Sequence, residues 1–206
     1  LSKDTFKARV VSWMQENQDL RKFSRTNSVA NVILNIEAIA KISDDVCLST
    51  WIDNQNLYMP SFINMKNGIF DLDRFLRCDQ PFLWAHSPKY FSTICLPYSL
   101  DLNARCPRWL AFLDKMQPTK DVRDLIQEWF GYNLVFDTTQ EKFVLFVGEG
   151  ANGKTVFCVV LRTLLGDMNV SAVGLEAFSP TRTFPLAATV GKLANIVEEL
   201  NEIDKA

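Results

Sequence analysis

The sequence contains a single histidine and no closely spaced pair of cysteines. This argues against a metal centre built from these residues. The only histidine, His86, lies in the segment FLWAHSPKY, whereas zinc sites combine several nitrogen and sulfur donors. We expect His86 to be a solvent-facing or hydrogen-bonded loop residue. The five cysteines include no C-x-x-C pair, so neither a disulfide framework nor a zinc motif is indicated. We expect these cysteines to be buried as small apolar side chains.

Long apolar runs and an excess of positive charge are also missing. No segment approaches the roughly 18 apolar residues of a membrane-spanning helix. The polar start LSKDTFKARV lacks the pattern of a signal peptide, so we expect a cytoplasmic protein. With 22 Lys and Arg against 24 Asp and Glu, the net charge of −2 disfavours a broad basic surface for nucleic acid.

The most informative segment is FVLFVGEGANGKT, at residues 143–155. Gly148, Gly153, Lys154 and Thr155 fill the fixed positions of G-x-x-x-x-G-K-[ST], a loop whose backbone N–H groups converge on phosphate oxygens. The glycines allow a tight turn and a close approach to phosphate. Lys154 is expected to reach the β- and γ-phosphates of ATP, and the Thr155 hydroxyl to bind Mg²⁺. The other predicted nucleotide-binding positions are Glu149, Gly150, Ala151 and Asn152.

The flanks of this loop fit the same interpretation. Residues 143–147 are five consecutive apolar residues and predict a buried strand. The segment TVFCVVLRTLL has apolar residues at helical spacing and predicts a helix that ends at Gly166. The N-terminus of such a helix favours an anion.

A second set of functional residues is predicted near the end of the sequence. Residues 193–197 suggest a short buried strand, followed directly by Glu198 and Glu199. One carboxylate would assist Mg²⁺, for which we take Glu198 together with Thr155, and the other would orient the attacking water. The predicted catalytic residues are thus Lys154, Glu198 and Glu199, although the two glutamates could instead belong to a solvated helix start. Arg182 and Lys192 could approach a nucleotide or a nucleic-acid strand, or could be ordinary exposed cations.

The rest of the chain predicts a mixed α/β fold. Helices are expected over 5–18, from a cap at Asn27 or Ser28 to about 42, from Pro107, and from a cap at Thr119 to about Gly131. Residues 50–100 indicate irregular β structure, with Asn67-Gly68 as a two-residue hairpin turn. The polar segment FDTTQE suggests a division into a helical and β module at 1–138 and a P-loop core at 139–206.

The order of these motifs resembles superfamily 3 helicases of the phage and plasmid primase-helicase type, including the poxvirus primase-helicase-like group. The resemblance rests on NGIFDLD, LPYSLDLNARCPRWLAFL, LIQEWFGYNL, FVGEGANGKTVF, LLGDMN and GKLANIVEELNE. It implies a module that precedes a motor, followed by the start of an AAA+-type ATPase core. It also implies ATP and Mg²⁺ as cofactors, with residues 148–155 as the nucleotide loop and Glu198 with Glu199 as the acidic motif.

The resemblance further implies the partners of the full-length protein. These are single-stranded or forked DNA, other copies of the chain in a hexameric ring, and a primase or polymerase domain fused on the N-terminal side. If a phage encodes the protein, its location would be the bacterial host cytoplasm. The family's sensor residue and trans-acting arginine would follow the acidic motif, so we expect this chain to be a fragment that binds nucleotide weakly and turns it over slowly.

Two other classes of function are compatible with the sequence. A P-loop kinase acting on a small molecule would share the strand, loop and helix, but would need an acceptor pocket and a lid. A non-enzymatic module in residues 1–135 could instead dock a partner or assemble a ring. DNA-independent phosphate transfer to a nucleoside would favour the kinase, and self-association without nucleotide binding would favour the module.

Overall fold

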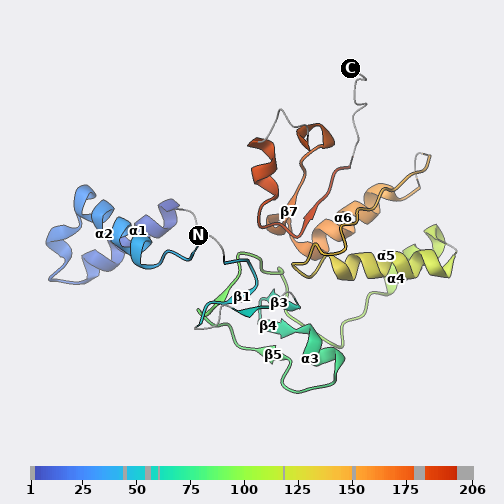
Figure 1. The fold of residues 1–206 in the computed structure, drawn as a ribbon, viewed down its shortest axis with the longest axis horizontal. Coiled ribbons are helices and arrows are strands. Elements are labelled where there is room, and N and C mark those ends of the chain that lie inside the picture. Colours follow the sequence, from blue (N-terminus) through green and yellow to red (C-terminus); the bar gives the residue numbers. More distant parts are fainter. Residues whose placement is uncertain are drawn as a thin grey trace. The chain divides into compact units, whose positions relative to one another are not determined.

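The structure, a computed structural model, describes residues 3–43, 46–53, 57–59, 61–117, 119–149, 152–178 and 184–198. It divides the chain into two compact units, Leu1–Val46 and Cys47–Ala206, which are treated separately below. Helices and small sheets both occur (Figure 1), which confirms the predicted α/β class. No helix among the described residues is both long and apolar enough to cross a bilayer.

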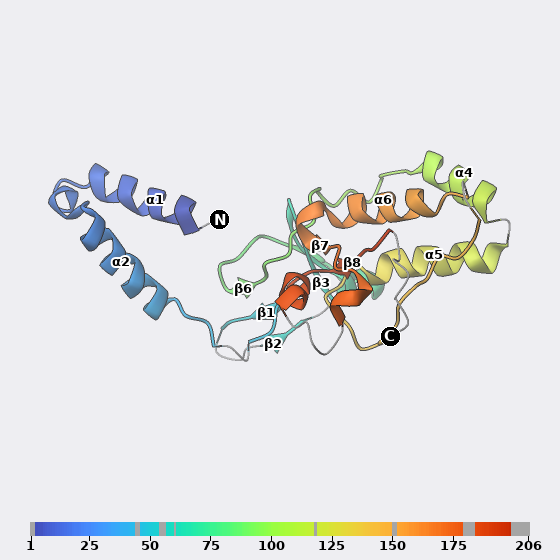
Figure 2. The same cartoon turned by 90° about the horizontal axis from the view of Figure 1, so that it is seen from above.

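The first unit is a helical hairpin. Helix α1 (Lys3–Glu16) and helix α2 (Thr26–Ile39) lie side by side and are joined by the short 3-10 helix η1 (Arg21–Phe23), as Figure 2 shows. Both helices were predicted, and their shared core consists of Val10, Met14, Val29 and Ile33. A groove between them is lined by Phe6, Arg9, Val10, Trp13, Val32 and Ile36.

The predicted cap of α2 was wrong. The helix begins at Thr26, with Arg25 at the N-cap position and no capping bond from its side chain. The Val29 N–H donates to the Arg25 carbonyl at 3.0 Å. Because this bond closes the first turn, Asn27 and Ser28 lie inside the helix and cannot cap it.

Residues 50–91 form two small antiparallel sheets, as the sequence predicted for this region. In the first, β1 (Thr50–Trp51) lies between β2 (Leu57–Tyr58) and β6 (Tyr90–Phe91). In the second, β4 (Gly68–Asp71) lies between β3 (Phe62–Met65) and β5 (Leu83–Trp84). The four residues of β4 are all buried, so this strand is the centre of the β part.

The β3–β4 hairpin differs from the prediction by one residue. Gly68 pairs with Met65, so the two turn residues are Lys66 and Asn67 rather than Asn67 and Gly68. The Asn67 side chain accepts from the Leu100 N–H at 2.9 Å and donates to the Leu100 carbonyl at 3.2 Å. Gly68 has φ +151°, and a Cβ there would overlap the Trp84 carbonyl oxygen. The glycine is therefore needed for close strand approach and not for the turn.

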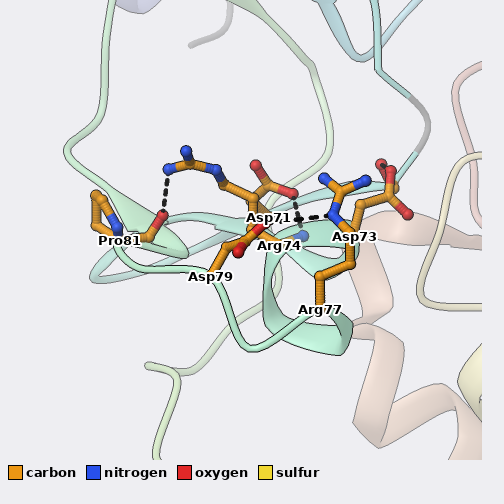
Figure 3. Close-up of polar contacts among 7 residues, drawn as sticks. Asp71, Asp73, Arg74, Arg77, Asp79 and Pro81 are labelled. Atoms are coloured by element: carbon orange, nitrogen blue, oxygen red, sulfur yellow. Dashed lines mark hydrogen bonds and ion pairs between the residues drawn. The ribbon is translucent and has the colours of Figure 1, made fainter.

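The short helix α3 (Leu72–Leu76) follows β4 and is held by local polar contacts (Figure 3). Asp71 caps it by accepting from the Arg74 N–H at 3.0 Å. The Arg74 guanidinium donates to the Pro81 carbonyl at 2.9 Å, and Arg77 pairs with Asp79 at 3.4 Å. Since α3 has only five residues, these contacts stabilise the connection from β4 to β5.

The second half of the chain packs around three helices (Figure 2): α4 (Pro107–Met116), α5 (Lys120–Tyr132) and α6 (Lys154–Leu165). Pro107 in the first turn of α4, Thr119 at the N-cap of α5 and Gly166 at the C-cap of α6 confirm the predicted helix ends. The connections after α6 contain η2 (Asp167–Asn169), η3 (Leu175–Phe178) and η4 (Phe184–Thr189). Strands β7 (Val170–Ser171) and β8 (Ala194–Asn195) pair in parallel.

These three helices and the two parallel strands share one core. Its buried members are Leu113, Ile126, Phe130, Phe157, Leu161, Leu165, Val170 and Ile196. Helices α4 and α5 therefore pack directly against α6. The division of the chain at 138/139 stays a prediction about its modules.

Asn169 connects this core to the β part. Its side chain is buried, and its Nδ2 donates to the carbonyls of Cys95 and Leu165, each at 2.8 Å. One bond reaches the segment after β6 and the other caps the last turn of α6. A buried amide placed between two carbonyls fixes both segments because leaving either acceptor unpaired is costly.

The expected burial of the cysteines was wrong. Cys47, Cys78, Cys95 and Cys106 are exposed, and only Cys158 is partly buried. The first four lie in connections or at the edges of elements, where the chain has too few neighbouring side chains to cover them. Cys158 lies on α6, next to the shared core.

Two glycine substitutions should have opposite effects on stability. Gly68→Ala should destabilise the protein by about 1 to 3 kcal/mol, because alanine is strained at φ +151° and collides with Trp84. Gly131→Ala should stabilise it by about 0.5 kcal/mol, since it lies in α5 with nothing within 4 Å of the added methyl group. Urea unfolding of both variants measures the difference, and equal effects would contradict this account of Gly68.

Asn169→Ala should destabilise the protein by about 1 to 3 kcal/mol, because a buried carbonyl acceptor at Leu165 and a partly buried one at Cys95 lose their donor. The exposed Asn103 supplies a matched control, and Asn103→Ala should change the free energy of unfolding by less than about 0.5 kcal/mol. A similar loss in both variants would refute the connecting role of Asn169.

Candidate nucleotide-binding site

The predicted phosphate loop leads directly into α6. The helix begins at Lys154, and Gly153 occupies its N-cap with φ +79°. Thr155 lies exposed in the first turn. The predicted helix is thus present, and the first backbone N–H groups of this twelve-residue helix follow the predicted loop.

The strand predicted before the loop was wrong. Residues 143–147 are not paired with any described strand, since β7 and β8 pair with one another. Phe143 and Val147 are each 84% exposed. Without a neighbouring strand, backbone hydrogen bonding cannot hold an apolar run extended in a sheet. Only Phe146 of this segment packs against the shared core.

Lys154 is the most highly connected residue of the loop. Its Nζ donates to the Gly148 carbonyl at 2.7 Å, the Glu149 carbonyl at 2.8 Å and Asn152 Oδ1 at 2.8 Å. All three donor positions of the ammonium are therefore directed into the loop. Among the described residues, its hydrogen-bond partners are neutral oxygens, which are weaker partners for a cation than anionic oxygens.

Two glycines make this arrangement possible. At Gly148 a Cβ would overlap the amide of Asn152, which crosses the loop toward Lys154. At Gly153 the left-handed φ favours glycine, and a Cβ would lie 3.0 Å from both Phe112 and Met116. The fixed glycines thus serve close packing within and behind the loop.

The acidic residue Glu198 lies near α6. It follows β8 and the buried Ile196, and its side chain is exposed. Burial raises the pKa of the Cys158 thiol, and the negative charge of Glu198 raises it further, while Arg162 opposes this. Glu198 is thus close enough to α6 for its charge to act on Cys158, which lies one helical turn after Lys154. Within the described residues, no hydrogen bond or ion pair joins Glu198 to Lys154 or Thr155.

Several predicted residues lie outside this arrangement or outside the described residues. Gly150, Ala151, Arg182 and Glu199 belong to the segments that the structure does not describe. Lys192 donates to the Met168 carbonyl at 2.6 Å. His86 contacts the Lys66 carbonyl at 3.3 Å, which confirms the expected hydrogen-bonded loop histidine.

The side chains around the loop fit magnesium in kind but do not form a complete cage. Thr155 and Glu198 are exposed and offer oxygen atoms, the donors that Mg²⁺ prefers. Across the described ranges, no three His, Cys, Asp or Glu side chains gather as a metal site. This suits an ion that takes one or two protein oxygens and completes its shell with phosphate and water.

The structure adds residues that the sequence analysis did not assign to the site. Phe112 and Met116 of α4 lie behind Gly153, and Phe146 stacks on Phe157 with ring centroids 5.2 Å apart. Helical spacing predicted an apolar face on α4, but spacing alone does not say which segment covers that face. Upstream of the loop, the Gln140 N–H donates to the Tyr132 hydroxyl at 3.4 Å, and the Tyr58 hydroxyl donates to the Phe136 carbonyl at 2.8 Å.

Two curated relatives are similar to this chain. An "Uncharacterized mitochondrial protein" of Marchantia polymorpha is 28% identical over 113 residues, which cover 48% of this chain and 63% of the relative. A "Putative helicase" of Acanthamoeba polyphaga mimivirus is 29% identical over 119 residues, which cover 56% of this chain and 12% of the relative. The chain therefore spans less than two thirds of the length of either relative.

A family model also matches the chain. Residues 5–118 match the family described as D5 N terminal like, a range that extends from α1 to just beyond the end of α4. The phosphate loop and α6 follow this range. Because the match extends over more than half of the chain, the protein belongs to the D5 N terminal like family, a domain found in primase-helicase proteins.

Proposed function

We propose that residues 148–155 bind ATP with Mg²⁺ and that the full-length protein couples ATP hydrolysis to DNA unwinding as a replicative primase-helicase. The observation that carries this proposal is the Lys154 ammonium, which is held inside a glycine loop at the start of α6. Membership of the D5 N terminal like family supports the helicase context.

Binding would follow from the groups already in the loop. The Lys154 ammonium would exchange the Gly148 and Glu149 carbonyls for anionic phosphate oxygens, which are stronger hydrogen-bond acceptors for a cation. The N–H groups of the loop and of the first turn of α6 would bind the remaining phosphate oxygens. Asn152, which bonds Lys154, would keep the ammonium directed toward them.

Magnesium would be held by the Thr155 hydroxyl and, through water, by Glu198. The ion would balance phosphate charge and polarise the terminal phosphate. Glu198 and Glu199 together would supply the carboxylate that orients the attacking water. The position of Glu198 near the N-terminal half of α6 supports this assignment.

The remaining features of the proposal concern the whole protein. They comprise an AAA+-type core after residue 138, a hexameric ring, single-stranded or forked DNA as the second substrate, and a fused primase or polymerase domain. A cytoplasmic location, that of a bacterial host for a phage-encoded protein, belongs to the same proposal. The resemblance of the sequence motifs supports these features, together with the helicase name of the mimivirus relative.

Lys154→Ala should weaken the binding of a fluorescent ATP analogue with Mg²⁺ by about 10- to 100-fold, because one charge-assisted set of hydrogen bonds to phosphate is lost. Fluorescence anisotropy with the intact chain measures this change. The matched control is Lys142→Ala, an exposed lysine upstream of the loop, which should leave affinity within about twofold.

Repeating this titration with single-stranded DNA distinguishes the helicase from the kinase. Stronger nucleotide binding in the presence of DNA would support the helicase. Phosphate transfer to a nucleoside without DNA would favour a small-molecule kinase. If Lys154→Ala and the wild type bind the analogue equally, the loop is not the nucleotide site.

Glu198→Gln should speed alkylation of Cys158 by about twofold to fivefold, because removing the negative charge lowers the thiol pKa and raises the thiolate fraction. Iodoacetamide labelling at pH 8, followed by peptide mass spectrometry, measures the rate at this cysteine. Labelling of the exposed Cys106 should be unchanged and serves as the internal control. An unchanged rate at Cys158 would mean that Glu198 does not lie beside α6.

A further inference from the structure

Helix α4 packs against the predicted phosphate loop at Gly153. Phe112 and Met116 are one helical turn apart and face Gly153, where a Cβ would lie 3.0 Å from Phe112 Cζ and 3.0 Å from Met116 Cε. Such a distance is shorter than side chains normally tolerate. A side chain at position 153 would therefore crowd α4, and glycine allows the loop backbone to lie close to that helix.

The two flanks of the loop meet at the ring of Phe157, which contacts α4. Phe146, two residues before Gly148, stacks on Phe157 with an interplanar angle of 8°. Phe157, two residues after Thr155, contacts Phe112 at a centroid distance of 5.3 Å. Phe112 in turn stacks on Trp109 at 5.6 Å. The start of the loop therefore reaches α4 through the Phe157 ring of α6, whereas Gly153 itself faces Phe112 and Met116 of α4.

The contact between α4 and Gly153 joins the family-matched region to the predicted loop that follows it. Helix α4 is the last helix of the region that matches the D5 N terminal like family, and the loop follows that region by about 30 residues. We propose that Phe112 and Met116 are positioning residues that set the conformation of the phosphate loop and couple nucleotide occupancy to the packing of α4. This inference rests on the proposed nucleotide site.

The coupling has a direct physical origin. When Lys154 exchanges loop carbonyls for phosphate oxygens, the loop must change shape around its ammonium. A Cβ at Gly153 would already require Phe112 and Met116 to give by a few tenths of an ångström, so a displacement of Gly153 toward α4 shifts those side chains. By thermodynamic linkage, a partner that binds one position of α4 changes the affinity for nucleotide. Nucleotide changes the affinity for that partner by the same factor.

Amide hydrogen exchange of the intact chain tests this coupling without any substitution. Mg²⁺ with a non-hydrolysable ATP analogue should slow exchange in peptides from 107–117 by about twofold or more, in addition to peptides from the loop and α6. Peptides from α1 and α2 should not change. Nucleotide-dependent protection confined to the loop and α6 would overturn the inference while leaving the nucleotide site intact.

Substitutions on α4 test the positioning role. Phe112→Leu keeps an apolar side chain but removes the ring, and it should weaken binding of the ATP analogue by about threefold to tenfold. Leu110→Ala, at an exposed position of the same helix, is the matched control and should bind like the wild type. Thermal unfolding of each variant identifies any loss that reflects folding, and Met116→Leu provides a second variant if Phe112→Leu is unstable.

A rescue experiment excludes a merely structural effect. Gly153→Ala should reduce nucleotide affinity by about tenfold, because its methyl group meets Met116 and its left-handed φ is strained. Adding Met116→Ala makes room for that methyl group and should restore affinity by about twofold or more. If Met116→Ala lowers affinity equally with glycine or alanine at position 153, the contact does not position the loop. Absence of nucleotide binding in the wild type would overturn both this inference and the proposed function.

Discussion

The burial of Phe157 between three other aromatic rings is the contact on which the second unit depends. The side chain is 2% exposed and contacts Trp109, Phe112 and Phe146, which come from α4 and from the segment before the loop. Aromatic pairs add packing energy to the large apolar area that each ring buries. This one side chain thereby joins a helix of the family-matched region, the loop and α6. The loop owes its shape to packing behind it as much as to its own glycines.

The sequence predicted the helices well because their signals are local. Pro107 marked the start of α4, Gly166 marked the end of α6, and apolar spacing gave α1, α2 and α5. The phosphate loop was recognisable because glycine, lysine and threonine have separate chemical roles at fixed spacing. Lys154 donates to loop oxygens and Gly153 has a left-handed φ, while nucleotide binding by residues 148–155 and the roles of Glu198 and Glu199 remain predictions.

What the sequence did not predict depends on partners far along the chain. The apolar run at 143–147 fits a buried strand only if another strand pairs with it, and β7 and β8 pair with one another instead. The hairpin turn lies one residue earlier than predicted, because Asn67 bonds Leu100 and Gly68 must approach Trp84 closely. The contact of α4 with Gly153 could not be predicted either, since an apolar helix face does not indicate which segment packs on it. Each of these differences reflects a tertiary contact overriding a local pattern.

Among the described residues, the segment that leads into the loop is held by a few contacts, including the hydrogen bond from the Gln140 N–H to the Tyr132 hydroxyl at 3.4 Å. Tyr58 holds the Phe136 carbonyl at its beginning, and Phe146 is inserted into the aromatic core near its end. Phe143 lies between these two contacts and Val147 directly follows Phe146. Both side chains are largely exposed to solvent. Rearranging such a segment breaks few buried contacts, so its local opening free energy lies far below that of global unfolding. The approach to the loop can therefore change conformation while the core around Leu113 and Leu165 stays folded.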